Sequence, residues 1–554
     1  MIVRPATRVV ASVVVAASLA LLPAGCRRGD SAATPAADSA PAQVAVEDDI
    51  AWFEGSVEQA FATAAAERKP LFLYWGAVWC PPCHALRTRI FPRPEIRARL
   101  AAAVPVYLDG DTERAQVWGE KLGTAGYPTV IVFDPDGREV TRLPGVLGVE
   151  DFAELLTTAL DAAKPLAERI AEAERVGPTG MAPAELELLA FHAWYQDERS
   201  GLDDTRRKAL FERFWRETPT DRPVVRSRFF AAHLGELARE ESTSPLDATE
   251  RDELVAALET LLSDREQRAA NIEVVLYGAG RVVARLAPEP GALRDRLIAA
   301  WQAAARALED DESWTTNDRL EALAPRIELA RLVAGDGAPL PAELLDRVRE
   351  RVRWAEGRVR DDEEMQAVMS TMAGLLEDAG LADETRALLS EKAASTVAPY
   401  YYTGWLAGLE ADAGRTAESV ALYRRAWQEA RAANDGTHGP AGRMTPLRWG
   451  SSYLRQAMKQ TPDATEVIAA DLAQVLDDAL AGPDAFAGGN WGRLESLAAA
   501  LLAWQGAADA PAERAAVVDA ARERVRSSCA ALGSAAPGVP DERCRGYLAE
   551  PASV

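Results

Sequence analysis

The length of this chain limits the number of its domains, and its charge limits the partners it can bind. It has 554 residues, too many for one hydrophobic core, so we expect roughly two to four domains. Its formal net charge of −23 argues against nucleic-acid binding, which requires a basic surface.

Residues 1–25 have the features of an export signal. Arg4 and Arg8 precede an apolar run from Val9 to Leu22, which is shorter than the roughly 20 residues needed to cross a bilayer. The run leads into Leu-Pro-Ala-Gly-Cys at residues 22–26, which resembles a bacterial lipoprotein signal. The resemblance implies that Cys26 is lipidated and holds the mature protein on the periplasmic side of an envelope membrane. An ordinary cleaved signal with an incidental Cys26 stays the alternative.

Residues 26–46 are rich in Ala, Ser, Pro and Asp, a composition typical of a flexible tether. Beyond the tether, no segment is apolar over a transmembrane length. We therefore expect a soluble protein attached to the membrane by lipid.

Residues 47–162 predict a small α/β domain built around a cysteine motif. Apolar runs indicate strands at 71–75, 104–108 and 130–133, with a further strand around 139–142. Trp-Cys-Pro-Pro-Cys, at 79–83, separates the first strand from a helix. Asp-Pro-Asp-Gly, which begins at Asp134, predicts a hairpin between the last two strands.

The spacing of Cys80 and Cys83 points to thiol–disulfide chemistry. Two thiols three positions apart at a strand-to-helix junction lie within disulfide reach, and the helix N-terminus stabilises a thiolate on the first. We therefore expect Cys80 to be the exposed, reactive sulfur, and we expect His84 on the helix surface. A zinc site needs two more ligands that the spacing does not supply, so we expect no metal and no cofactor. A purely structural disulfide stays an alternative.

This domain resembles the thioredoxin family, and it is similar in particular to periplasmic members such as the C-terminal domain of DsbD. The likeness is carried by Trp-Cys-x-x-Cys and by Gly-Tyr-Pro-Thr at 126–129, which precedes an apolar strand. It implies that Cys80 attacks, that Cys83 resolves the mixed disulfide, and that Trp79, Tyr127 and a cis-proline at Pro128 bind substrate. Tyr74 departs from the family, whose cytosolic thioredoxins carry a buried Asp there for proton transfer.

The remaining chain is expected to be an all-α helical array, rich in Ala, Leu, Glu and Arg. We expect an α-helical domain over 163–395, an α-helical, tetratricopeptide-like region over 396–506, and a C-terminal helix with a disulfide-stapled tail over 507–554. One apolar stripe at helical spacing follows Thr249 and Asp252, which predict a capping box. An aromatic cluster at 400–405 predicts either core packing or a peptide-binding wall. The residues at tetratricopeptide-type positions are Leu406, Ala407, Gly414, Ser419, Tyr423 and Ala426; helical hairpins that share a core are the alternative.

Two further cysteines lie near the C-terminus. Cys529 and Cys544 flank a stretch broken by Gly and Pro, and in an oxidising compartment they predict a structural disulfide. An internal substrate for the Cys80–Cys83 pair is the other interpretation.

Together these features predict an envelope thiol–disulfide oxidoreductase, of reductase or isomerase type, that acts on other envelope proteins with cysteine pairs. Such a protein needs a redox partner that donates or accepts electrons. The alternative is a helical scaffold or adaptor whose thioredoxin fold docks partners without redox turnover. The sequence leaves the oligomeric state, the direction of electron flow and the partner undetermined.

Overall fold

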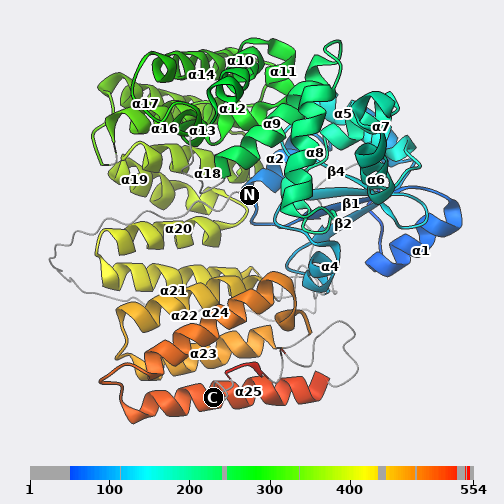
Figure 1. Cartoon of the computed structure of the whole chain (residues 1–554). Helices are drawn as coiled ribbons and strands as arrows, with labels where there is room; N and C mark the ends of the chain where they lie inside the picture. Colours follow the sequence, from blue (N-terminus) through cyan, green and yellow to red (C-terminus); the bar gives the residue numbers. More distant parts are fainter. Residues whose placement is uncertain are drawn as a thin grey trace, which may run out of the picture. The chain divides into compact units, whose positions relative to one another are not determined.

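The computed structural model describes residues 50–112, 114–239, 246–335, 337–433, 444–480, 483–532, 543 and 546–548 (Figure 1). Within these residues, a small α/β sheet domain is followed by a largely helical region, as the sequence predicts. None of the helices in the described ranges combines the length and apolarity needed to cross a membrane.

The first part of the chain is a four-stranded sheet with flanking helices. The strand order is β2-β1-β3-β4; β1 runs parallel to β2 and antiparallel to β3, and β4 runs antiparallel to β3. All residues of β1 are buried, as expected for a central strand that reads as a continuous apolar run. The elements are α1 (Val57–Glu67), β1 (Leu71–Gly76), α2 (Pro81–Arg89), α3 (Pro94–Leu100), β2 (Val104–Asp109), α4 (Ala115–Leu122), β3 (Thr129–Phe133), β4 (Glu139–Leu143) and α5 (Val149–Asp161).

Local sequence signals explain two of the boundaries in this domain. Ser56 and Gln59 form a capping box at the start of α1, so two otherwise unpaired amides are satisfied. Between β3 and β4, Asp134 accepts hydrogen bonds from the backbone amides of Asp136 and Arg138, and Gly137 adopts a φ of +78°. The predicted hairpin is therefore confirmed.

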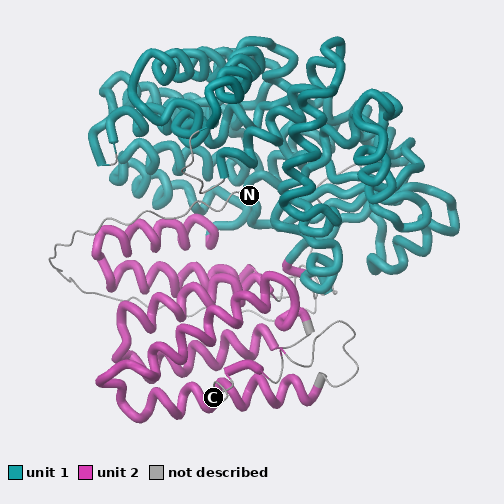
Figure 2. Tube along the Cα trace, in the orientation of Figure 1, with its two compact units in different colours: residues 1, 48–110, 114–399 teal, residues 2–47, 111–113, 400–554 magenta. Residues whose placement is uncertain are grey.

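The chain divides into two compact units (Figure 2). Unit 1 holds residues 48–110 and 114–399, and unit 2 holds residues 111–113 and 400–554. The finer domain boundaries expected from the sequence stay predictions. Beyond the sheet, unit 1 contains α6 (Leu166–Val176), η1 (Pro178–Gly180), α7 (Pro183–Ala190), η2 (Trp194–Gln196), α8 (Asp204–Glu217), α9 (Pro223–Arg239), α10 (Ala248–Ser263), α11 (Arg265–Ala270), α12 (Ile272–Leu276), α13 (Ala279–Leu286), α14 (Ala292–Asp310), α15 (Thr316–Glu321), α16 (Ala324–Ala334), α17 (Ala342–Glu356), α18 (Asp362–Asp378), α19 (Ala382–Lys392) and η3 (Ala393–Ser395).

The capping box predicted at Thr249 and Asp252 is wrong. Helix α10 begins at Ala248, and its N-cap is Asp247, whose carboxylate accepts hydrogen bonds from the backbone amides of Thr249 and Glu250. Asp is as good an N-cap as Thr, and the chain already enters the helix two residues before Thr249. The apolar stripe itself is buried, as predicted.

The regular elements of unit 2, within its described residues, are all helices. Gly414, at a φ of +73°, turns the chain between two paired helices, and Ser419 of the second donates a hydrogen bond to the carbonyl oxygen of Ala407 at 2.8 Å. Tyr400 and Tyr402 of the aromatic cluster are buried, which favours the core interpretation. The elements are α20 (Pro399–Asp412), α21 (Thr416–Ala432), α22 (Thr445–Gln460), α23 (Thr465–Ala479), η4 (Pro483–Phe486), α24 (Gly488–Gln505) and α25 (Ala512–Leu532).

Candidate functional site

The two cysteines of the motif close a disulfide where β1 leads into α2. Their sulfurs are bonded, and their Cα atoms are 5.2 Å apart. Cys80 is the N-cap of α2, and its sulfur accepts a hydrogen bond from the backbone amide of Cys83 at 3.2 Å. That amide and the helix dipole stabilise negative charge on Cys80 once the disulfide is reduced. The predicted strand-to-helix placement is therefore confirmed.

Aromatic side chains meet beside the motif. Trp79 contacts Tyr127 edge to face, with ring centroids 5.4 Å apart, and Trp75 stacks on Tyr127 at 5.6 Å. The Tyr127–Pro128 peptide bond is cis, as the family resemblance implied. The structure thus brings Trp79 and Tyr127 together, and the role of both residues and of Pro128 in substrate binding stays a prediction.

The sulfurs are enclosed, which corrects the expectation of an exposed Cys80. The exposed fraction is 0% for Cys80 and 1% for Cys83, and His84, expected on the helix surface, is also buried. The physical reason is a tertiary contact, because α2 packs against α18 of the helical region (Figure 1). There Gln366 donates a hydrogen bond to the carbonyl oxygen of Trp79 at 2.9 Å.

A network of tyrosines and one carboxylate supports the loop that leads into the motif. Tyr74 donates a hydrogen bond to the carbonyl oxygen of Cys83 at 3.3 Å, and its ring stacks on Tyr107 at 5.2 Å. The hydroxyl of Tyr107 donates to Oδ2 of Asp109 at 3.0 Å. The same oxygen accepts from the backbone amide of Val78 at 3.1 Å, so Asp109 anchors this loop.

Asp109 is not among the residues predicted from the sequence. It pairs with Gly76 across the parallel β1–β2 ladder, so pairing the two apolar runs in register would have found it. Burial raises the pKa of Tyr107 well above its usual value, and the charge of Asp109 adds to this effect. The hydroxyl of Tyr107 therefore stays protonated and continues to donate to Asp109.

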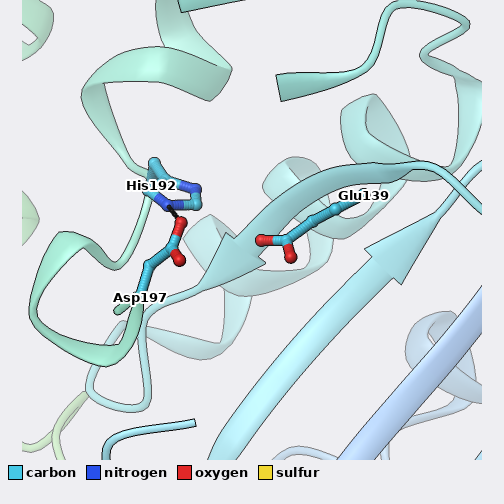
Figure 3. Close-up of side chains that lie close together, drawn as sticks. All are labelled: Glu139, His192 and Asp197. Carbon is cyan, nitrogen blue, oxygen red and sulfur yellow. Dashed lines mark hydrogen bonds and ion pairs between the residues drawn. The ribbon is translucent and has the colours of Figure 1, made fainter. Parts of the chain in front are cut away.

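A second cluster, distant in sequence from the cysteines, has the composition of a metal site. Within the described part of the chain, potential ligand atoms of Glu139, His192 and Asp197 lie within 4.8 Å of one another (Figure 3). Nδ1 of His192 accepts a hydrogen bond from the backbone amide of Arg142 at 3.2 Å. Nε2 therefore carries the ring proton and donates to Asp197 at 3.0 Å, so both ring nitrogens are committed.

Arg142 already supplies the positive charge of this cluster. Its guanidinium is completely buried and lies 2.9 Å from Glu139 and 3.3 Å from Asp197. These contacts identify the cluster as an ion-pair network that fastens β4 to the segment around η2. The backbone amide of Ala193 donates to the carbonyl oxygen of Arg142 at 2.9 Å, which adds a main-chain bond to the same junction.

This network predicts a pH-dependent contribution to stability. Burial alone would raise the pKa of Asp197, but the hydrogen bond from His192 and the charge of Arg142 outweigh it, and the pKa is lowered. A lowered pKa means that the stabilisation is fully present above the usual carboxyl value of about 3.9 and is lost as the pH falls through the folded-state value. In urea unfolding, the stability gap between wild type and Asp197→Asn should therefore close below about pH 4. A gap of constant size down to pH 2 would contradict the network.

Two predicted cysteine sites remain, the lipid anchor at Cys26 and the disulfide between Cys529 and Cys544. Cys26 and Cys544 lie outside the described residues, and Cys529 lies in α25. The lipid anchor and the Cys529–Cys544 disulfide stay predictions.

Comparison with known proteins agrees with this geometry. Residues 57–160 match the model of the thioredoxin-like domain. Over 103 residues the chain is 32% identical to the thiol:disulfide interchange protein DsbD of Cronobacter sakazakii, an alignment that covers 18% of each protein. Over 113 residues it is 31% identical to the DsbD of Ralstonia nicotianae, covering 20% of this chain and 18% of the relative. The chain thus spans less than a fifth of the length of the curated relatives it matches.

The family match covers residues 57–160, which include the cysteine pair at the start of α2. Together with the similarity to two interchange proteins, it indicates thiol–disulfide chemistry at a general level. Residues 57–160 are a thioredoxin-like domain, joined in this chain to a largely helical region.

Proposed function

We propose that this protein is a thiol–disulfide oxidoreductase of the bacterial cell envelope. The observation that carries the proposal is the Cys80–Cys83 disulfide, which closes at the N-terminus of α2 within a thioredoxin-like domain. The two relatives are named as thiol:disulfide interchange proteins, which supports the same reaction class.

The reaction balances without a cofactor. In the reduced protein, the Cys80 thiolate attacks a substrate disulfide, forming a mixed disulfide and releasing one substrate thiolate. Cys83, as its thiolate, then attacks Cys80, which releases the second substrate thiolate and closes the Cys80–Cys83 disulfide. The substrate gains two electrons that this pair loses, so a dithiol partner protein must reduce the pair again. The reverse sequence would oxidise substrates, and we favour reduction or isomerisation because the domain resembles members of reducing pathways.

The reduction potential of the Cys80–Cys83 pair tests this proposal. Exchange proteins have potentials of roughly −270 to −120 mV, whereas structural disulfides of secreted proteins lie below about −300 mV. Equilibration with glutathione or dithiothreitol buffers, followed by alkylation and mass spectrometry, gives the value. A potential in the structural range would defeat the proposal, and one in the exchange range would support it.

The proposed substrates are envelope proteins with cysteine pairs, and the proposed location is the periplasmic side of a membrane, with Cys26 as the lipid anchor. Replacing Cys26 with serine should release the protein into the soluble envelope fraction, because serine cannot carry the lipid that is proposed to anchor the protein. Carbonate washing and fractionation measure this. Retention of the Cys26→Ser protein in washed membranes would contradict a lipid anchor at this residue.

A second candidate function is a helical scaffold or adaptor. The observation that favours it is the burial of Cys80 and Cys83, which leaves neither residue of the disulfide exposed in the described conformation. The double variant Cys80→Ser, Cys83→Ser separates the two functions. An adaptor keeps its activity in cells without these thiols, whereas an oxidoreductase loses it.

A further inference from the structure

The enclosed disulfide sets a physical requirement for any exchange reaction. An attacking thiolate must approach one sulfur in line with the disulfide bond, which is impossible while both sulfurs are shielded. With exposed fractions of 0% and 1%, neither Cys80 nor Cys83 can be reached in the described conformation. The conformation that reacts must therefore differ from this one near the motif.

Helix α18 of the helical region packs against α2 (Figure 1). Gln366 of α18 is completely buried and uses both ends of its amide. Its nitrogen donates to the carbonyl oxygen of Trp79 at 2.9 Å, and its oxygen accepts from the backbone amide of Ala398 at 3.1 Å. One side chain thus ties the residue before Cys80 to the segment just before α20.

Opposite charges face each other along the same contact. Helix α2 carries no acidic residue, and its basic groups meet acidic groups of the helical region. Glu363 of α18 lies 3.8 Å from Nδ1 of His84 and 3.8 Å from the guanidinium of Arg87. Arg89 pairs with Asp318 of α15 at 2.7 Å.

Helix α2 is the most extensive helix partner of α18 among the described residues, and these polar contacts are part of that interface. Their net contribution to stability is modest, because both partners of each hydrogen bond or ion pair return to water when the helices separate. Helix α18 also packs against α15, α17 and α19. Separation of α2 from α18 can therefore occur while the helical region keeps its own core.

We propose that the α2–α18 contact is a gate over the redox pair, and that disulfide exchange occurs only when α2 separates from α18. The proposal rests on the proposed oxidoreductase function. It assigns the helical region a role, which is to control access to Cys80 and Cys83. Gln366 and Glu363 are the residues that hold the gate closed.

The experiment measures how fast dithiothreitol reduces the Cys80–Cys83 disulfide in the full chain. Samples are quenched with acid at intervals, alkylated and analysed by mass spectrometry. The variants are Glu363→Gln, Gln366→Ala and their combination. Glu364→Gln is the matched control, because it removes the same charge one residue further along, where Glu364 pairs with Arg360 rather than with α2.

The gate predicts about a tenfold faster reduction for the double variant at low dithiothreitol, which corresponds to about 1.4 kcal/mol in the closing equilibrium. Glu364→Gln should react at the wild-type rate. In guanidinium chloride all five proteins should react equally, because unfolding removes the gate and leaves the same disulfide. Circular dichroism checks folding; if the double variant does not fold, Glu363→Gln alone should still react about threefold faster.

Equal rates for the wild type and the folded gate variants would overturn the gate. So would an increase in Glu364→Gln as large as that in Glu363→Gln. These rates report the access of a small thiol and involve no protein substrate. Failure of the gate is therefore distinguishable from failure of the oxidoreductase function, which would show in the reduction potential.

Discussion

Replacing Cys80 with serine should reduce disulfide exchange to the background rate of the small thiol alone. Cys80 is the N-cap of α2, where a backbone amide and the helix dipole stabilise its thiolate, and a serine hydroxyl at this position is not ionised at neutral pH. Cys83 lies within the first turn of α2 and keeps its thiol, but it lacks the N-cap position. Insulin reduction with dithiothreitol as the electron source measures the loss.

Replacing Cys83 with serine is the informative control for this prediction. Cys80 can still attack a disulfide, but no second thiol resolves the product, so the mixed disulfide should accumulate. With 5,5′-dithiobis(2-nitrobenzoate), the Cys83→Ser protein should retain a bound nitrobenzoate that the wild type releases. Accumulation in the Cys80→Ser protein instead would reverse the proposed roles of the two cysteines.

The second large effect concerns stability. Arg142→Met should lower the free energy of unfolding by about 3–5 kcal/mol, because it leaves the buried Asp197 and the partly exposed Glu139 without their cation. The Arg142 side chain is completely buried between Glu139 and Asp197. It also donates to the backbone carbonyl oxygens of Gly123 and Leu122, at 3.0 and 2.5 Å, which would lose their donors. Urea unfolding followed by circular dichroism measures the change.

Arg206→Met is the matched control for Arg142→Met. Arg206 of α8 pairs with Glu174, but both side chains are largely exposed, so water replaces the lost contacts. The expected change is within about 1 kcal/mol. If Arg142→Met is no more destabilising than this control, the buried network does not fasten β4 to the segment around η2.

A closed gate and a catalytic disulfide are compatible if the open state is a minor population. The observed rate of disulfide exchange is then the rate in the open state multiplied by the fraction of molecules that are open. A substrate or partner that binds only the open state increases that fraction and so increases the observed rate. The scaffold function predicts no such dependence. Reduction kinetics therefore test the gate, and the cellular activity of the cysteine variants tests which of the two candidate functions holds.

The features that depend on near neighbours in the chain were predictable from the amino-acid sequence. Continuous apolar runs identified β1 to β3, the Asp-Gly pair identified the hairpin before β4, and helical spacing identified the buried stripe of α10. The thioredoxin-like domain was found in the same way, because the cysteine motif and the Gly-Tyr-Pro-Thr stretch are short local patterns. Strand and helix periodicity arise within one element, so a single sequence records them.

The accessibility of the site depends on contacts between distant segments, which local patterns do not reveal. The hydrogen bond between Gln366 and Trp79 joins residues 287 positions apart, and no local pattern marks either as a partner of the other. Cys80 and His84 are buried where α2 packs against α18, and the role proposed for α18 rests on the same packing of distant segments. The same holds for Asp197, whose partners Arg142 and His192 form one network only after β4 meets the segment around η2. Burial and ion pairing depend on which surfaces meet in the fold. The residues that form such a surface are often far apart in the sequence, so a local pattern does not reveal them.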